Sequence, residues 1–206
     1  MRLLARALCL AALLLTAGCA LTVDTIDVRY EPPPQPAAAV PGAEAVMVAV
    51  TARDARTAYR DRVSSKKNGY GMEMAQIVAR GDVIAEVQRA VLAEMAARGF
   101  RAGGAPDALI EVDVLRFYSD FKVGFWTATA DAEVLLNVRV RGAEQPFSAT
   151  YSGTNSVGGI VVFSGENAAP ALNAALRDAV QKMVIDPLFI AAVMAARPTY
   201  GRRPGS

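Results

Sequence analysis

The apolar residues that follow Asp82 recur with the period of an α-helix. One helical face collects Val83, Ile84, Val87, Val91, Leu92 and Met95. Asp82 is a good N-cap residue, and Gly99 suits the left-handed position that follows a helix C-terminus, from which Phe100 can fold back on the last turns. The pattern predicts an amphipathic helix that covers a sheet.

Further along the chain, apolar and polar residues alternate with a period of two. This holds from Ala108 to Val114 and resumes at Phe147, Ala149 and Tyr151. The longest run has one apolar face, formed by Trp126, Ala128, Ala130, Ala132, Val134, Leu136, Val138 and Val140. Its opposite face carries Thr127, Thr129, Asp131, Glu133, Leu135, Asn137 and Arg139. The alternation predicts half-buried antiparallel strands. The short apolar run 160–163 either extends a strand or caps the core.

A second amphipathic helix is predicted after Ser164, which can serve as its N-cap. Its buried stripe contains Leu172, Leu176, Val180 and Met183 or Val184. Asp186-Pro187 interrupts the helix, and residues 188–196 form a further helical turn or two. With a short apolar strand at residues 45–50, the element order is β-α-β-β-β-α. This order predicts an α+β two-layer sandwich, with a mainly antiparallel β-sheet and two helices packed on one face.

The regions outside these elements suggest the domain boundaries. Residues 19–44 contain the proline-rich run Glu31–Pro36 and are expected to form a lipidated N-terminus and an extended tether, with room for a short edge strand at 25–30. Residues 45–196 form a single domain, and residues 197–206 a disordered tail. The polar segment from Asp54 to Met74 is interpreted as a long loop or irregular hairpin, which is either a solvated connection or a contact loop for a partner.

The first 18 residues have the layout of a secretory signal peptide. Arg2 and Arg6 precede an apolar stretch, which ends in the small-residue run Thr16-Ala17-Gly18-Cys19. This run resembles the lipobox of bacterial lipoproteins. The resemblance implies cleavage between Gly18 and Cys19 and transfer of a diacylglyceryl group to the Cys19 thiol. Because Ala20 and not Asp follows the cysteine, the sorting rule for such proteins implies an outer-membrane anchor with the domain facing the periplasm.

The composition argues against most catalytic classes. The chain has no histidine, so serine–histidine and cysteine–histidine nucleophile systems are excluded. Its two cysteines are Cys9, in the signal, and Cys19, at the lipid site, which leaves the usual ligands of zinc, haem and iron–sulfur sites missing from the mature domain. Without Arg2 and Arg6 the mature chain has 20 basic and 20 acidic residues, which does not indicate a nucleic-acid partner. We expect no cofactor, no metal and no enzymatic activity.

The order of segments resembles that of the YajG family of small bacterial lipoproteins. The segments that carry the resemblance are Thr25–Val28, Asp54–Arg56, the helix and Arg-Gly-aromatic run 87–100, Leu109–Val112, Phe147–Tyr151 and Asn167-Ala168. The biochemical role of this family is not established. The resemblance therefore implies anchor, compartment and architecture, and no catalytic residues.

Three functions are compatible with these features. The first is a non-enzymatic accessory that binds an envelope protein partner, with Phe125 and Leu135 on the exposed strand face as contact candidates. The second is a periplasmic binder of a glycan or lipid, with Tyr118, Phe121 and Trp126 as stacking residues, in a pocket between sheet and helices or under the 54–74 loop. The third is a carboxylate-dependent hydrolase. It would use the same-side acids Glu111 with Asp113, or Asp131 with Glu133, about 7 Å apart along the strand.

Overall fold

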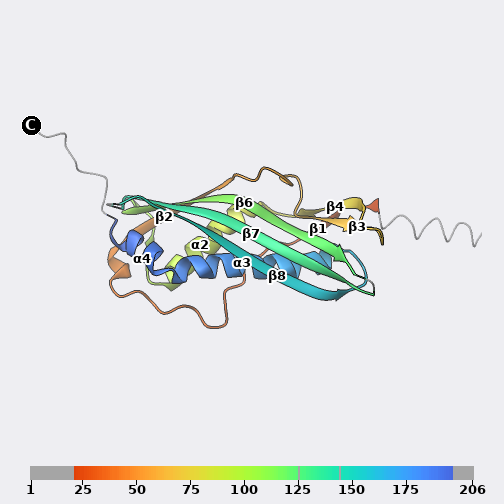
Figure 1. Ribbon diagram of the computed structural model, residues 1–206. Coiled ribbons are helices and arrows are strands. Elements are labelled where there is room, and N and C mark those ends of the chain that lie inside the picture. Colours follow the sequence, from red (N-terminus) through yellow and green to blue (C-terminus); the bar gives the residue numbers. More distant parts are fainter. Residues whose placement is uncertain (1–20, 125, 144, 197–206) are drawn as a thin grey trace, which may run out of the picture.

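The computed structural model describes residues 21–124, 126–143 and 145–196 (Figure 1), and these residues form two sheets packed on α-helices. The five-stranded sheet has the order β5-β2-β6-β7-β8. Its strands are β2 (Met47–Asp54), β5 (Arg101–Ala102), β6 (Ala108–Val123), β7 (Ala128–Arg141) and β8 (Phe147–Ile160). The smaller sheet, with the order β1-β4-β3, contains β1 (Asp24–Ile26), β3 (Ser64–Lys67) and β4 (Glu73–Ala79).

The helices lie on one face of the large sheet, as the periodicity predicts. They are α2 (Val83–Ala97), α3 (Gly165–Ile185) and α4 (Pro187–Met194), preceded by a short 3-10 turn η2 (Ala43–Ala45). Strands β6, β7 and β8 are antiparallel, whereas β2 pairs in parallel with β5 and β6. The predicted α+β class is confirmed. Within the large sheet the predicted order β-α-β-β-β-α also holds, apart from the two-residue β5.

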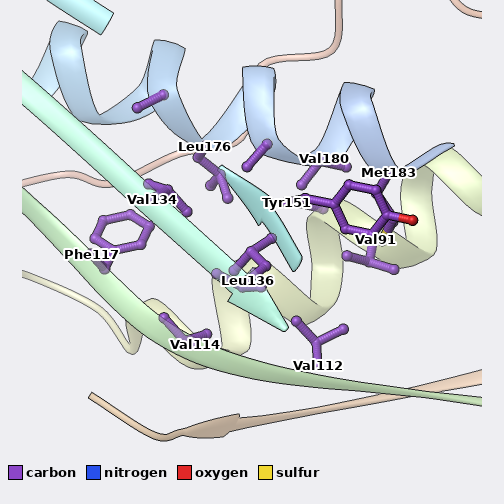
Figure 2. Close-up of a cluster of buried hydrophobic side chains, with 14 of the residues drawn as sticks. Val91, Val112, Val114, Phe117, Val134, Leu136, Tyr151, Leu176, Val180 and Met183 are labelled. Carbon is purple, nitrogen blue, oxygen red and sulfur yellow. The ribbon is translucent and has the colours of Figure 1, made fainter. Parts of the chain in front are cut away.

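The hydrophobic core lies between this sheet and the helices. Figure 2 shows buried side chains of α2 and α3 directed at those of the strands. The helices contribute Val91, Leu176, Val180 and Met183, and the strands Val112, Val114, Phe117, Val134, Leu136 and Tyr151. In β7 every even-numbered residue from Ala128 to Val140 is buried, whereas Trp126 lies before the strand and is exposed.

Helix α2 has the predicted ends. The Asp82 carboxylate accepts hydrogen bonds from the backbone N–H groups of Ile84 and Ala85, at 2.8 and 3.4 Å. At the other end Gly99 has a φ of +95°, its N–H donates to the Ala96 carbonyl, and the Phe100 N–H donates to the Met95 carbonyl. This is the paired bonding of a Schellman motif, in which only glycine adopts the required φ without strain.

Strand β6 extends well beyond the predicted 108–114 because a β-bulge interrupts its alternation. The register shifts between Val114 and Arg116. Before the bulge the even-numbered residues Ile110, Val112 and Val114 face the core, and after it the odd-numbered Phe117 and Phe121 do. A bulge inserts one residue and so reverses which parity points inward.

The 54–74 segment is an irregular hairpin and not a long loop. Strand β3 pairs with β4 in antiparallel register, with an irregularity between Lys66 and Lys67. The backbone N–H of Ser119 in β6 donates to the carbonyl of Val63, at 2.8 Å. The small sheet therefore lies beside the second half of β6, with which β2 does not pair.

The prediction of an extended tether is wrong from Asp24 onward, because this segment packs on the domain. β1 forms an edge strand that pairs in parallel with β4, near the strand expected at 25–30. The chain then runs along the helix layer towards α4 (Figure 1). Along the way the backbone N–H of Tyr30 donates to Glu86, and the Val40 N–H donates to the Arg98 carbonyl.

Tyr30 fastens this segment to both long helices. Its hydroxyl donates to Glu94 Oε1 at 2.6 Å and accepts from Gln181 Nε2 at 3.1 Å. Burial and the neighbouring Glu94 carboxylate raise the pKa of Tyr30 above its usual range, so the hydroxyl keeps its proton. The side chain therefore supplies a hydrogen-bond donor to a carboxylate that is itself buried in α2.

The Tyr30→Phe variant is expected to be less stable by about 1–3 kcal/mol, because the buried Glu94 loses this donor. Urea unfolding of the mature domain measures the change. Tyr70→Phe is the matched control: Tyr70 is exposed, so its hydroxyl remains solvated in either state and stability changes by less than about 0.5 kcal/mol. If the two variants were equally stable, the Tyr30 hydroxyl would not be what fixes residues 27–45 to the helices.

Candidate functional site

The lipid-attachment residues predicted from the sequence, Gly18 and Cys19, lie outside the described residues, as do the signal peptide 1–18 and the tail 197–206. Described structure begins with Leu21, and β1 begins at Asp24, five residues after Cys19. None of the described helices is long and apolar enough to cross a lipid bilayer.

The acid pair Glu111 and Asp113 is held by arginines on the outer face of the sheet, the face opposite the helices. Arg53 binds Asp113 through two nitrogens, one of them at 3.0 Å. Arg139 Nη2 lies 3.1 Å from Asp113, and Arg141 Nε lies 2.8 Å from Glu111. The hydrogen bond from Arg53, with the charge of Arg139, holds the pKa of Asp113 below its usual range. A general acid needs a raised pKa, so Asp113 is unsuited to that role.

The second acid pair, Asp131 and Glu133, is also engaged in ion pairs. Lys122 Nζ lies 2.6 Å from Asp131, and the Ser156 hydroxyl donates to the same carboxylate at 2.6 Å. Arg116 Nε lies 2.8 Å from Glu133. The hydrogen bonds from Lys122 and Ser156 lower the pKa of Asp131. The same-side placement of these acids is as predicted, but the pKa values of Asp113 and Asp131 are lowered, whereas the acid of a hydrolase mechanism requires a raised one.

The three aromatic residues considered for sugar stacking do not form one site. Tyr118 is buried and stacks on Tyr59, with ring centroids 4.1 Å apart. Phe121 is buried against Phe163, with centroids 5.2 Å apart. Trp126 is exposed in the turn between β6 and β7. The predicted stacking platform is therefore wrong, since two of its three members belong to the interior.

An open hollow of about 670 Å³ lies on the outer face, over the far halves of β6, β7 and β8. We call this surface the charged hollow; it is lined by Arg116, Asp120, Lys122, Asp131, Ala132, Glu133, Thr154, Asn155 and Ser156. Opposite charges meet between β6 and β7, where Arg116 pairs with Glu133 and Lys122 with Asp131. On the β8 side the two acids are in register with the uncharged Thr154 and Ser156. Of the expected contact residues, Leu135 is half-buried on the same strand face, and Phe125 lies outside the described residues.

A smaller pocket of about 270 Å³ lies beside the 55–62 loop. Buried Arg56 organises this loop: it binds both oxygens of Asp54 at 2.9 Å and donates to the carbonyls of Tyr59 and Arg60. The Arg56 hydrogen bond lowers the pKa of Asp54 to about 2. Charged side chains line much of the pocket, and its volume is below the roughly 300–1,000 Å³ typical of small-molecule sites. Arg56 thus makes its hydrogen bonds to Asp54 and to the backbone of the loop.

A buried ionic cluster that the sequence did not indicate joins β1, β3 and α3. Lys66 Nζ lies 2.7 Å from Asp24 Oδ1, and Asp24 Oδ2 accepts from the backbone N–H of Gly165 at 3.0 Å. Ser164 occupies the N-cap position of α3, but its side chain makes no capping hydrogen bond, so Asp24 supplies the cap in its place. Contacts this distant in sequence leave no local pattern.

Within the described ranges, no group of three or more acidic, histidine or cysteine side chains could hold a metal ion. The two acid pairs are engaged in ion pairs, and Tyr118 and Phe121 belong to the interior. The charged hollow is an open polar surface on the outer face of the sheet.

A mixed sheet backed by amphipathic helices on one face defines a small α+β domain. The chain belongs to the family described as uncharacterized lipoprotein, whose model matches residues 32–193. This is the YajG-like family that the sequence resembles, and the resemblance is confirmed. The matched range begins within the segment expected to be a tether and includes residues 32–44 of it.

The matches to solved structures include two of low identity. One is a crystal structure of a Xanthomonas campestris protein of the DUF330 family, which covers 79% of this chain and 92% of its own at 16% identity, with a TM-score of 0.49. The other, of an uncharacterized protein, covers 77% of this chain and 97% of its own at 10% identity, with a TM-score of 0.42. The comparison with curated proteins gives no match.

Proposed function

We propose that the chain is a lipoprotein anchored through Cys19 in the outer membrane, and that its periplasmic domain is a non-enzymatic accessory that binds an envelope protein. Family membership supports the lipoprotein class, and the residues Gly18-Cys19-Ala20 support cleavage, lipidation and outer-membrane sorting. The observation that carries the binding role is the charged hollow, which no other element of the described chain covers.

The chemistry of the hollow favours a polar protein surface over a small ligand. It is wide and open, and its ion pairs are partly exposed: the Lys122 side chain is 66% accessible and that of Arg116 is 46% accessible. Partly exposed pairs contribute little to stability, typically about 0–1 kcal/mol. Such charges can change partners at low cost, and complementary charges across an interface set specificity and orientation.

The alternative, a glycan or lipid binder, has weaker support. It requires an enclosed, largely apolar site with a few placed polar groups. The aromatic side chains meant to provide stacking are dispersed, and the pocket beside the 55–62 loop is small and charged. Recovery of a stoichiometric glycan or lipid from the purified protein would favour this alternative.

The test uses the full-length chain expressed in cells, with a photo-crosslinking amino acid at Thr154 in the hollow. We expect the protein in the outer-membrane fraction, with an intact mass that begins at Cys19 and includes acyl groups. On illumination, position 154 should give a discrete protein adduct. The same crosslinker at Ile185, an exposed residue of α3 on the helix layer, is the matched control and should give none.

A charge reversal separates specific binding from chance proximity. Glu133→Arg places two arginines together beside position 154 and should lower the adduct yield at least tenfold, while the thermal unfolding midpoint stays within a few degrees. An unmodified Cys19, or a product cut elsewhere, would overturn the anchor. Equal adducts from positions 154 and 185, or an adduct insensitive to Glu133→Arg, would overturn the binding surface.

A further inference from the structure

Three connections of the chain meet at the end of the molecule where β1 lies, opposite α4 (Figure 1). The register of the large sheet places Val123, Ala128 and Ile160 side by side, so the β6–β7 turn and the start of the β8–α3 connection are neighbours. That connection leads directly to Gly165, which bonds to Asp24 of β1. Lys66 of β3 bonds to the same carboxylate, which brings the β3–β4 hairpin to this end as well.

This end exposes large apolar side chains to an unusual degree. Trp126 in the β6–β7 turn is 86% exposed, Tyr70 in the β3–β4 turn is 90% exposed, and Val161 after β8 is 80% exposed. Met72, Val162 and Leu21 are also exposed there. Of the thirteen exposed large apolar residues in the described chain, nine belong to these connections, their flanking strand ends or the segment before β1. We call this group the apolar tip. Its concentration at one end distinguishes it from the scattered apolar residues of an ordinary surface.

Only a short length of chain connects the proposed lipid-attachment residue, Cys19, to β1 and the apolar tip. Because β1 runs parallel to β4, with Asp24 opposite Ile77, the residues before Asp24 lead toward the start of β4 and the β3–β4 turn. Asp24 is the fifth residue after Cys19. At about 3.3–3.6 Å per extended residue, the lipid attachment is within roughly 18 Å of β1. A free stalk of 25 residues would have allowed any orientation, whereas this short link does not.

We propose that the apolar tip docks on the lipid bilayer that carries the anchor, with Trp126, Tyr70 and the valines of the β8–α3 connection in the headgroup region. The inference rests on the proposed acylation of Cys19. Tryptophan and tyrosine favour the membrane–water interface because their rings are apolar with one polar group. Exposed aliphatic side chains gain free energy by leaving water for the upper acyl region.

Docking fixes the orientation of the domain. The long axis stands away from the membrane, since α4 lies at the opposite end from the tip (Figure 1). The charged hollow, on the side of the sheet near the tip, then faces sideways just above the bilayer. A partner that binds there would itself be close to the membrane.

The chain supplies its own probe, because Trp126 is its only tryptophan. The test uses the purified mature lipoprotein reconstituted in vesicles of phosphatidylethanolamine and phosphatidylglycerol, with or without lipids brominated on their acyl chains. We expect bromine to reduce Trp126 emission at least twofold, and the vesicles to reduce its quenching by acrylamide severalfold relative to a non-acylated Cys19→Ala mature chain free in solution. The matched control is Trp126→Phe with Leu188→Trp, since Leu188 is an exposed apolar residue of α4.

Intact mass of the same sample separates the two hypotheses. Acylated protein with Trp126 quenched by brominated lipid and position 188 unaffected supports the docked tip. Acylated protein in which Trp126 escapes lipid quenching, or in which both positions are quenched equally, overturns the tip while leaving the proposed anchor intact. A mass without acyl groups overturns the anchor and the docking that rests on it.

Discussion

Replacing Gly153 by alanine is expected to destabilise the domain by about 3 kcal/mol, near the upper end for overpacked sites. A Cβ atom at this position of β8 would lie 2.0 Å from the Ala175 carbonyl oxygen and 2.4 Å from the Ala179 backbone nitrogen. Both atoms belong to the backbone of α3, so no side-chain rotation relieves the overlap. The helix must move away from the sheet.

This close approach explains the small residues on the sheet-facing side of α3. Ala171, Ala175 and Ala179 are fully buried and recur every four residues, which leaves a shallow groove along the helix. Gly153 fits against that groove. Nearby, the Asp178 carboxylate accepts from the Thr154 N–H, and Lys182 donates to the Ser152 carbonyl. These bonds satisfy backbone groups of an edge strand that would otherwise be open to pairing with another chain.

Urea unfolding of the mature domain measures the Gly153→Ala effect. Gly158→Ala in the same strand is the control, because the nearest atom to its added Cβ is the Thr129 methyl carbon at 4.0 Å. It should change stability by less than about 0.5 kcal/mol. If Gly153→Ala were as stable as Gly158→Ala, helix α3 could not lie as close to β8 as the structure has it.

The elements that the sequence predicts well are those with an uninterrupted local period. Helix α2 and strand β7 bury the residues on their apolar faces, with the exceptions that Ile84 and Leu92 are only partly buried and Trp126 precedes the strand. For α3 the sequence pattern predicts the large apolar residues of the buried stripe but not the alanine groove. Alanine is favoured throughout helices by intrinsic propensity, so its presence does not reveal a packing contact.

Several elements were missed because their determinants are not local. The second half of β6 follows a bulge that reverses the alternation, so the pattern of its first half ends at Leu115. Strand β3 buries Ser64, Ser65 and Lys66, polar residues that composition assigns to solvent. The proline-rich segment resembles a tether in sequence. Tyr30 nevertheless bonds to Glu86 and Glu94, two buried acids of α2, and no local pattern indicates that contact.

The same difference between local and long-range determinants applies to the candidate site. The sequence correctly placed the acids of β6 and β7 on the outer face, because strand alternation determines the side. It could not supply their partners: Arg53 and Arg139 come from two other strands, β2 and β7, and reach Asp113 only in the folded sheet. The hydrolase hypothesis depended on those missing neighbours, since they set the pKa of the carboxyl group.

Asp24→Asn is the second change with a large expected effect, about 3 kcal/mol less stability at pH 7, at the low end for a broken buried ion pair. The Lys66 side chain is 10% exposed and that of Asp24 is 27% exposed. Asparagine can still accept from the Gly165 N–H, but it removes the negative charge that Asp24 places 2.7 Å from the buried Lys66 ammonium. Asp27→Asn is the control: the Asp27–Arg80 pair is exposed, so its loss should change stability by less than about 1 kcal/mol.

The pH dependence tests the same ion pair independently. Burial raises the pKa of Asp24, but the hydrogen bonds from Lys66 and Gly165 and the Lys66 charge outweigh it, so the pKa lies below its usual value. The folded state thus binds this proton less readily than the unfolded state does. The stabilisation is complete above the unfolded pKa, about 3.9, and is lost as pH falls through the lower folded pKa. Urea unfolding should therefore show the gap between wild type and Asp24→Asn constant from pH 7 to 5 and shrinking below pH 4.

A gap that stays constant down to pH 2 would mean that Asp24 binds its proton equally well in the folded and unfolded states, contrary to its pairing with Lys66. The variant also bears on anchoring, because Asp24 holds both β1 and the start of α3 five residues after Cys19. Once β1 loosens, the link between lipid and domain becomes longer and the domain less constrained. Quenching of Trp126 by brominated lipids should then fall in Asp24→Asn and stay unchanged in Asp27→Asn, which would connect the buried ion pair to the orientation of the domain on the membrane.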